Sequence, residues 1–224
     1  MFSRKDVDAI LRAVEKLNTQ MGLFAVIIPL LFAVIVVLLL LYCYRNPGRK
    51  SSRALIGSLA VIYVFSGWTI FAGRSEMGTT EALVGAIALW FVAFLLIIDT
   101  IFHWTEVRWP ERFDLKVFSV FFMVAGIFIY PLLEMILGFK WPDMVLFGAE
   151  CPTTIFLIGL FIGSIPRVNK PLFVIISLNA IATGGSVAMN GAPFDYLYAL
   201  AGVVGIVMIV KYFRRIFGKE VSRA

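Results

Sequence analysis

Charge is scarce in this 224-residue sequence, in which Asp, Glu, Lys and Arg make up 15% of the residues and hydrophobic residues 61%. The few charges gather between long apolar runs, which excludes a water-soluble globular domain and is typical of a membrane protein. Strand-like alternation over ten-residue segments, the mark of an outer-membrane barrel, is also missing. We therefore expect an all-α, polytopic helical bundle, in which about 20 apolar residues cross about 30 Å of hydrocarbon.

Cysteine and histidine are equally rare, with two cysteines, Cys43 and Cys151, and a single histidine, His103. These numbers exclude a disulfide framework, a cysteine-rich zinc site and the multi-histidine ligation of haem pairs or di-iron centres. No Walker loop, dinucleotide fingerprint or HExxH motif is present either. We therefore expect no cofactor and lean against an enzyme, while the sequence leaves the question of a metal open.

The apolar residues form seven segments separated by Pro, Gly and charged residues: Met21–Tyr44, Ala54–Ala72, Thr80–His103, Val117–Leu137, Met144–Ile165, Leu172–Met189 and Tyr196–Tyr212. The first is too long for the apolar core of a signal peptide, so it should remain as a membrane span. We expect about seven transmembrane helices in one domain over residues 21–212, an amphipathic helix over 1–20 and a basic tail over 213–224.

Basic residues favour one side of this bundle. Loops 45–53, 105–116 and 166–170, together with the tail after Val210, hold 14 of the 20 Lys and Arg residues, whereas the other three loops hold only Arg74 and Lys140. The positive-inside rule then predicts a cytoplasmic C-terminus and an outside N-terminus. The net charge of +6 is explained by lipid headgroups, not by nucleic acid.

Residues 3 to 18 place apolar side chains on one helical face and charged ones on the other. The apolar face holds Val7, Ile10, Leu11, Val14 and Leu17, and the charged face holds Arg4, Lys5, Asp8, Arg12 and Glu15. This pattern predicts an amphipathic helix. It either lies in the membrane interface or docks on a partner protein.

Two of the expected spans carry ionisable side chains that lipid disfavours. In the third, Asp99 and His103 are four residues apart, so they can pair as carboxylate and imidazole or can simply be structural. In the fourth, Pro131 removes a backbone hydrogen bond and predicts a kink beside Tyr130 and Glu134. Glu134 is then either part of an ion or proton pathway or a carboxylate that reaches water at the outer edge.

The sixth expected span has a polar stripe, because Asn179, Thr183, Ser186 and Asn190 fall at i, i+4, i+7 and i+11. Such a stripe either lines a cavity or bonds to neighbouring helices. The small residues Gly159 and Gly163 of the fifth span permit another helix to approach closely.

Residues 147 to 156, FGAECPTTIF, interrupt the fifth span. Gly148 can break the helix, Cys151 fits the N-cap position and Pro152 fits the first position of a new helix. The helix that restarts there is too short to cross alone, so we expect the break to lie within the outer leaflet and to form a polar hollow. Broken helices build the binding sites of many secondary transporters.

The C-terminal half resembles a family of bacterial and archaeal multi-pass membrane proteins that is catalogued as a domain of unknown function. The resemblance rests on Tyr130–Pro131, Gly138, Pro142, the FGxxCPTTIF string of residues 147–156, Pro171 and Gly184–Gly185. It implies six or seven membrane helices in the plasma membrane of a prokaryote, without substrate or cofactor. The family pattern has a histidine where this chain has Phe139, which argues against a metal site at the outer face.

Three functions remain open from the sequence. The first is a small transporter or channel for a small polar solute or ion, with a pathway in the outer half built from Tyr130, Glu134, Glu150, Cys151, Thr153, Thr154, Asn179, Thr183 and Asn190. The second is a structural subunit that binds other membrane subunits, or itself as a homo-oligomer, within the lipid bilayer. The third is a membrane-embedded thiol enzyme or sensor that uses Cys151, or the inner pair Asp99 and His103.

Overall fold

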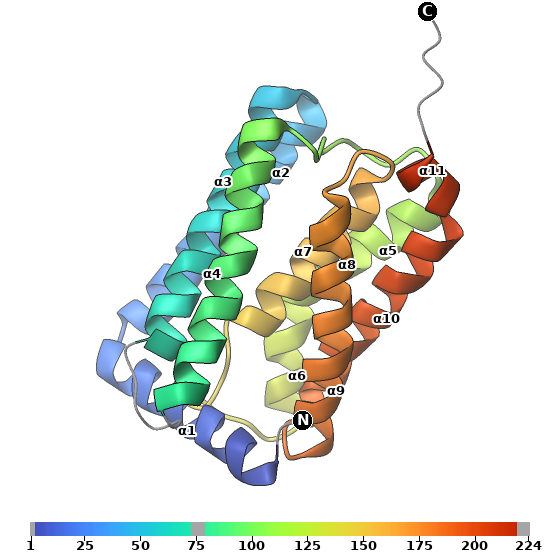
Figure 1. Ribbon diagram of the computed structural model, residues 1–224. Helices are drawn as coiled ribbons and strands as arrows, with labels where there is room; N and C mark the ends of the chain where they lie inside the picture. Colours follow the sequence, from blue (N-terminus) through green and yellow to red (C-terminus); the bar gives the residue numbers. More distant parts are fainter. Residues whose placement is uncertain (1–2, 73–78, 219–224) are drawn as a thin grey trace, which may run out of the picture.

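The computed structural model describes residues 3–72 and 79–218, and helices make up most of both ranges (Figure 1). Six helical stretches are long and apolar enough to cross a membrane: Phe24–Arg45, Arg49–Phe71, Ala82–Phe102, Phe113–Ile136, Lys170–Met189 and Pro193–Lys211. The all-α, multi-pass architecture is therefore confirmed. The remaining expected segment contains only the 15-residue helix α7, Glu150–Ser164, which is about 22 Å long.

The helices form two groups that stand side by side in Figure 1. The first group contains α1 (Arg4–Met21), α2 (Phe24–Arg45), α3 (Arg49–Ser66), the π-helical turn η1 (Gly67–Ala72) and α4 (Thr79–Phe102). The second contains α5 (Phe113–Val124), η2 (Ala125–Ile129), α6 (Tyr130–Ile136), α7, α8 (Lys170–Asn179), η3 (Ala180–Gly184), α9 (Gly185–Met189), η4 (Pro193–Asp195), α10 (Tyr196–Lys211) and α11 (Phe213–Phe217). The groups meet where α4 packs against α8.

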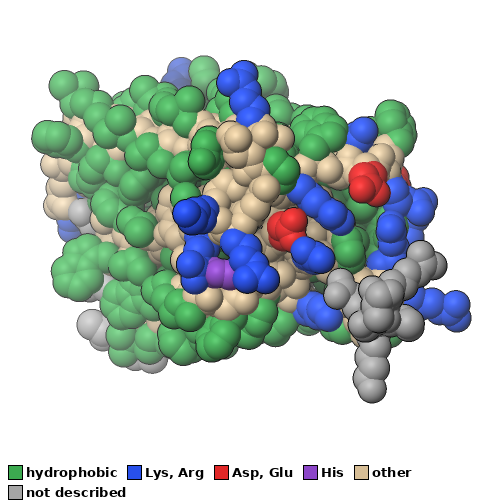
Figure 2. Space-filling view, turned by 90° about the horizontal axis from the view of Figure 1, so that it is seen from above, with side chains coloured by type: hydrophobic (Ala, Val, Ile, Leu, Met, Phe, Trp, Pro, Cys, Tyr) green, Lys and Arg blue, Asp and Glu red, His purple; other side chains and the backbone are tan. Residues whose placement is uncertain are grey.

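The outward faces of the helices are apolar. Leu30 and Leu38 on α2, Val84 on α4 and Val207 on α10 are each more than half exposed, and hydrophobic side chains gather around the outer edge of the bundle in Figure 2. Water would penalise so large an apolar surface, whereas hydrocarbon chains match it. We therefore treat the chain as a membrane protein whose outer surface contacts lipid.

The two ends of the bundle differ in charge. One end, here called the basic face, consists of residues 45–53, 103–116, 165–170 and 211–218, and Figure 2 shows its Lys and Arg side chains from above. Helix α1 lies at the opposite end. The expected separation of basic loops therefore holds for the described residues, although Arg74, Lys219 and Arg223 lie outside them.

Helix α7 forms the centre of the second group, and residues 152–164 are all buried. A β-carbon at Gly159 would lie 2.8 Å from the Met123 nitrogen and 2.9 Å from the Ser119 oxygen, both on α5. The close helix approach expected from Gly159 and Gly163 is thus present, and its partner is a helix of the same chain. Small residues allow this contact because they bring the two backbones together.

Helix α1 begins with a capping box, in which the Ser3 hydroxyl accepts from the Asp6 nitrogen and the Asp6 carboxylate accepts from the Ser3 nitrogen. These bonds lower the pKa of Asp6. Val7, Val14 and Leu17 are buried, so the helix rests on the bundle with its apolar face. Its position in the membrane interface remains a prediction.

Candidate functional site

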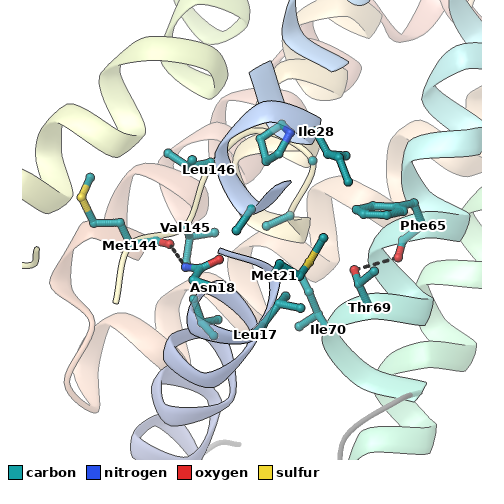
Figure 3. A pocket seen from close by; sticks show the side chains of 15 residues that line it. Leu17, Asn18, Met21, Ile28, Phe65, Thr69, Ile70, Met144, Val145 and Leu146 are labelled. Carbon is teal, nitrogen blue, oxygen red and sulfur yellow. Dashed lines mark hydrogen bonds between the residues drawn. The ribbon is translucent and has the colours of Figure 1, made fainter. Parts of the chain in front are cut away.

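The chain between α6 and α7 enters the bundle as irregular backbone. Residues 137–149 contain no helix, yet Met144, Phe147 and Gly148 are buried. In Figure 3 Met144 and Val145 lie beside Asn18 of α1, and together with Leu146 they form part of the lining of a small hollow of about 50 Å³. We name residues 142–149 the entry segment. The sequence predicts a helix that breaks at Gly148–Cys151 and restarts; the structure instead has irregular backbone over residues 137–149 and one helix that starts at Glu150.

Side chains bind the polar backbone groups of the entry segment. The Asn18 amide donates to the carbonyls of Pro142 (2.6 Å) and Met144 (2.9 Å), the second of which is drawn in Figure 3. The Val145 nitrogen donates to both oxygens of the Glu134 carboxylate, at 3.1 and 3.0 Å. Such bonds are what non-helical backbone needs inside a membrane. Glu134, which is fully buried, therefore holds the segment in place instead of reaching water.

The start of α7 differs from the sequence prediction. The helix begins at Glu150 with Ala149 in the cap position, so Cys151 is not the N-cap and Pro152 is the third helical residue, not the first. Proline is tolerated there because the first-turn N–H groups have no intrahelical partner. Gly148 has φ +105°, which a residue with a β-carbon rarely adopts. Its nitrogen donates to the Thr153 hydroxyl at 3.0 Å.

A polar network surrounds the first turns of α7. Asn179 Nδ2 donates to Glu150 Oε1 (3.2 Å) and to the Tyr198 hydroxyl (3.1 Å), and the Thr183 hydroxyl donates to Asn179 Oδ1 (3.2 Å). One turn further along α7, the hydroxyls of Thr154 and Tyr63 are 2.6 Å apart. This network therefore joins α3, from the first helix group, to α7, α8, η3 and α10 of the second.

A hollow of about 110 Å³ adjoins this network between the two helix groups. Glu150, Thr154, Asn179 and Tyr63 supply its polar lining, and the remaining lining is apolar: Ala88, Leu89, Phe91, Val92, Ile175 and Ile176. Asn179 is the tenth residue of the 20-residue Lys170–Met189 span, so the hollow lies near the middle of the membrane. We call it the Glu150 hollow. Its volume is sufficient for more than one water molecule or a small ion.

A second polar cluster lies beside the first. The Tyr130 hydroxyl donates to Asp195 Oδ1 at 2.5 Å, and the Cys151 thiol interacts with both side chains. Tyr130 follows the π-helical turn η2, so the irregularity expected from Pro131 is present as a widened turn directly before it.

The carboxyl groups of Glu134 and Asp195, which are buried, and of Glu150, which is half-buried, have only neutral hydrogen-bond partners among the described residues. The ion pairs formed between two described residues, Arg112–Asp114, Arg167–Glu106 and Lys211–Asp114, lie on the basic face and include none of these three carboxyl groups. Among the residues that the structure describes, no group of three or more His, Cys, Asp or Glu side chains is arranged to hold a metal ion. An ionised carboxylate without a cation is costly at this depth. Each of the three therefore either keeps a proton or takes a cation as its partner.

The predicted polar stripe is divided in the structure. Asn179 and Thr183 contact the Glu150 network, whereas Asn190 donates to the carbonyl of Ser186 in its own helix, at 2.8 Å. The π-helical turn η3 lies between Asn179 and Ser186. Because a π turn contains more residues than an α turn, the i, i+7 and i+11 positions no longer share one row.

Of the two interpretations that the sequence left open for Asp99 and His103, an ion pair or structural groups, the structure shows no bond between the two side chains. The Asp99 carboxylate accepts from the Thr105 nitrogen (2.8 Å) and hydroxyl (2.6 Å), and His103 Nδ1 accepts from Arg53 Nε at 3.1 Å. Helix α4 ends at Phe102, and His103 adopts φ +60°. Because the backbone changes direction at His103, the imidazole no longer lies on the same helical face as Asp99, which the i, i+4 spacing requires for a pair.

Several site residues gave no clear signal in the sequence. Tyr63 and Tyr198 are fully buried partners in the network, but a tyrosine within an apolar run is common in membrane helices and reveals no role. Asp195 is recognisable in the sequence as an acid at the start of the last span, but its position in the sequence does not indicate that it accepts a hydrogen bond from Tyr130. Asn18 lies within an amphipathic helix, where polar residues are ordinary.

Comparison with known proteins places the chain in a family. The model of a family of unknown function, DUF6064, matches residues 7–219. No curated protein matches the chain, and no solved structure matches it.

Proposed function

The chain belongs to the DUF6064 family, whose function is unknown, and from that premise we propose that it carries a small cation across the membrane through the Glu150 hollow. The orientation expected from the positive-inside rule completes this proposal, with the N-terminus outside and the C-terminus in the cytoplasm of a prokaryote. The entry segment then approaches the hollow from the outer side. In this proposal the seven membrane segments are the six long helices and the pair formed by the entry segment and α7.

One observation carries the proposal: a carboxyl group beside a mid-membrane hollow has only neutral partners. Glu150 bonds to Asn179 and interacts with Tyr198, and no lysine or arginine of the described residues pairs with it. A site for an anion would need donors of positive charge, whereas this one offers a carboxylate and hydroxyl oxygens. Intramembrane acids of this kind are common in ion and proton pathways.

The position of the hollow between the two helix groups supports a carrier. Tyr63 comes from the first group, and Glu150, Thr154 and Asn179 come from the second. A relative movement of the two groups would change access to the carboxyl group without breaking either group. Rocking of one bundle against another is how many secondary transporters alternate access.

The test is a flux measurement in proteoliposomes with a pH-sensitive dye inside and a potassium diffusion potential across the membrane. We expect protons to enter these vesicles faster than they enter protein-free vesicles. If the cation is sodium, the same design with a sodium-sensitive dye should show faster sodium entry. Glu150→Gln should reduce the flux at least tenfold, and Glu111→Gln, which removes the same charge from an exposed loop, should retain it. Vesicles as tight as protein-free ones to H⁺, Na⁺, K⁺ and NH₄⁺ would refute the proposal.

A second candidate function, a subunit of a larger membrane complex, is favoured by a different feature. An apolar hollow of about 550 Å³ opens between α2 and η2, and its lining includes Leu30, Val34, Phe128 and Phe147. A helix of another membrane protein, or of a second copy, would fill such a surface. The mass of the protein extracted in mild detergent decides this, since a uniform free monomer contradicts an obligate subunit.

The thiol-dependent enzyme or sensor remains a third proposal. Cys151 is half-buried beside Asp195 and Tyr130, while Cys43 is fully buried. A single reactive thiol without a second one nearby is poorly suited to thiol–disulfide exchange. If Cys151→Ser leaves the cellular phenotype unchanged, this proposal is refuted for Cys151.

A further inference from the structure

Two adjoining hollows open on the basic face. The smaller, of about 260 Å³, is lined by Arg49, His103 and Arg167 among others. The larger, of about 620 Å³, is lined by Lys170, Arg215 and again Arg167. Trp104 also lines both. We name the combined surface the basic groove, whose charged and aromatic side chains are Arg49, His103, Trp104, Glu106, Arg167, Lys170 and Arg215. It is distinct from the Glu150 hollow, which lies near mid-membrane.

The charge of the basic groove suits an anion. It holds four cationic side chains and one acid, Glu106, so its net charge is +4 − 1 = +3. Glu106 pairs with Arg167, and no carboxylate of the described residues pairs with Arg49, Lys170 or Arg215. Guanidinium and ammonium groups converging on one depression are typical of phosphate recognition.

The hydrogen bond between Arg53 and His103 indicates which ring nitrogen of the neutral imidazole is the donor. Arg53 Nε donates to His103 Nδ1 at 3.1 Å, and a guanidinium nitrogen is always a donor. Nδ1 is therefore an acceptor, which leaves the hydrogen of the neutral imidazole on Nε2. Arg53 also donates to the carbonyls of Thr100 and Ile101 at the end of α4, and these bonds fix its orientation.

The surface beside the groove is apolar and faces lipid. Ile101 is 57% exposed and Phe102 64% exposed, and the Phe102 ring stacks on Trp104 with 5.8 Å between the ring centroids. A basic depression therefore continues directly into a surface that contacts acyl chains. A soluble phosphate would contact only the basic depression, whereas a phospholipid would contact the depression with its headgroup and the apolar surface with its acyl chains. Trp104 fits this arrangement, because tryptophan favours the level of the lipid headgroups.

We propose that the basic groove binds the phosphate of an anionic phospholipid from the adjacent leaflet, with an acyl chain along Ile101 and Phe102. The first helix group supplies Arg49, in α3, and His103, which directly follows α4. The second group supplies Arg167, Lys170 and Arg215. The bound phosphate joins the two groups across the boundary where α4 meets α8. This proposal is independent of the Glu150 hollow and of what passes through it.

Native mass spectrometry of the full-length protein in detergent tests the proposal with dioleoylphosphatidylglycerol and, for comparison, dioleoylphosphatidylcholine. We expect selective binding of the anionic lipid. Arg49→Ala and Arg215→Ala should each weaken it about fivefold, the effect of one basic residue near an anionic lipid. Lys50→Ala and Arg214→Ala are the matched controls, because these residues are the exposed sequence neighbours of Arg49 and Arg215 and line neither hollow. The controls should stay within twofold of the wild type.

Three results would overturn the proposal. Equal losses in the groove variants and in their neighbours would show diffuse charge attraction in place of a site. Equal binding of both lipids would show that the headgroup is not recognised. Displacement of the anionic lipid by millimolar inorganic phosphate would identify a soluble-anion site. The melting temperature of each variant separates a local loss of binding from misfolding. The conservative variant Arg49→Lys, which keeps the positive charge, serves the same purpose.

Discussion

The hydroxyl of Tyr130 lies 2.5 Å from Oδ1 of Asp195 and donates a hydrogen bond to it. The bond connects the helix that begins at Tyr130 with the start of the last span, across 65 residues of sequence. Both side chains are buried, and Asp195 has no basic partner in the described part of the chain. The phenol is therefore a principal donor to this acid.

Removing that donor should destabilise the protein. Tyr130→Phe leaves the Asp195 carboxyl without its partner, and we expect the free energy of unfolding to fall by about 1–3 kcal/mol. Unfolding in detergent with increasing denaturant measures the change. Tyr196→Phe is the control, because Tyr196 is exposed and should lose less than about 0.5 kcal/mol. Equal stability of the two variants would contradict the assigned role of the bond.

The contact between α5 and α7 predicts a second difference between two similar substitutions. Gly159→Ala places a methyl group 2.8 Å from the Met123 nitrogen, so we expect a loss of about 1–3 kcal/mol from overpacking. Gly185→Ala meets no atom within 4 Å and should be neutral or slightly stabilising, since alanine favours a helix. The melting temperatures in detergent provide the comparison, and a loss in Gly185→Ala as large as in Gly159→Ala would argue against the packing explanation.

Asn18 connects α1 to the entry segment and predicts a third effect. Asn18→Ala removes the donors to the Pro142 and Met144 carbonyls, and two buried acceptors without partners should cost about 1–3 kcal/mol each. Limited proteolysis should then cut residues 142–149 faster than in the wild type. Gln20→Ala, an exposed change two residues later on the same helix, should not alter the cleavage rate. Similar protection in both variants would show that Asn18 does not hold the segment.

Much of the fold could be predicted because lipid imposes simple requirements. The long apolar runs indicate spans directly, and the basic loops alternate with the others. The irregular backbone before α7 was also predictable, because Gly148 and Pro152 interrupt an apolar run that is otherwise long enough to cross. The helix start was misplaced by two residues, since proline is tolerated at more than one position of a first turn.

The candidate site was predictable only in part. Glu150, Thr154 and Asn179 line one hollow, but their partners Tyr63 and Tyr198 come from other helices, and pairing between distant helices leaves no trace in one sequence. The stripe is divided because the π-helical turn η3 alters the helical period between Asn179 and Ser186, and a π turn has no reliable sequence signal. Whether Asp99 pairs with His103 or only has a structural role could not be decided from the sequence, because the spacing does not show that α4 ends at Phe102, one residue before His103.

The proposed cation pathway requires that water and small cations reach the Glu150 hollow near the middle of the membrane. Cysteine accessibility measures this most directly, with Thr154→Cys compared with Ile158→Cys in a Cys43→Ser, Cys151→Ser background. Thr154 lines the Glu150 hollow, whereas Ile158, one turn away on α7, is fully buried and is not part of that lining. We predict that a small methanethiosulfonate reagent labels Thr154→Cys at least tenfold faster than Ile158→Cys. Equal, negligible labelling of both folded variants would contradict the account.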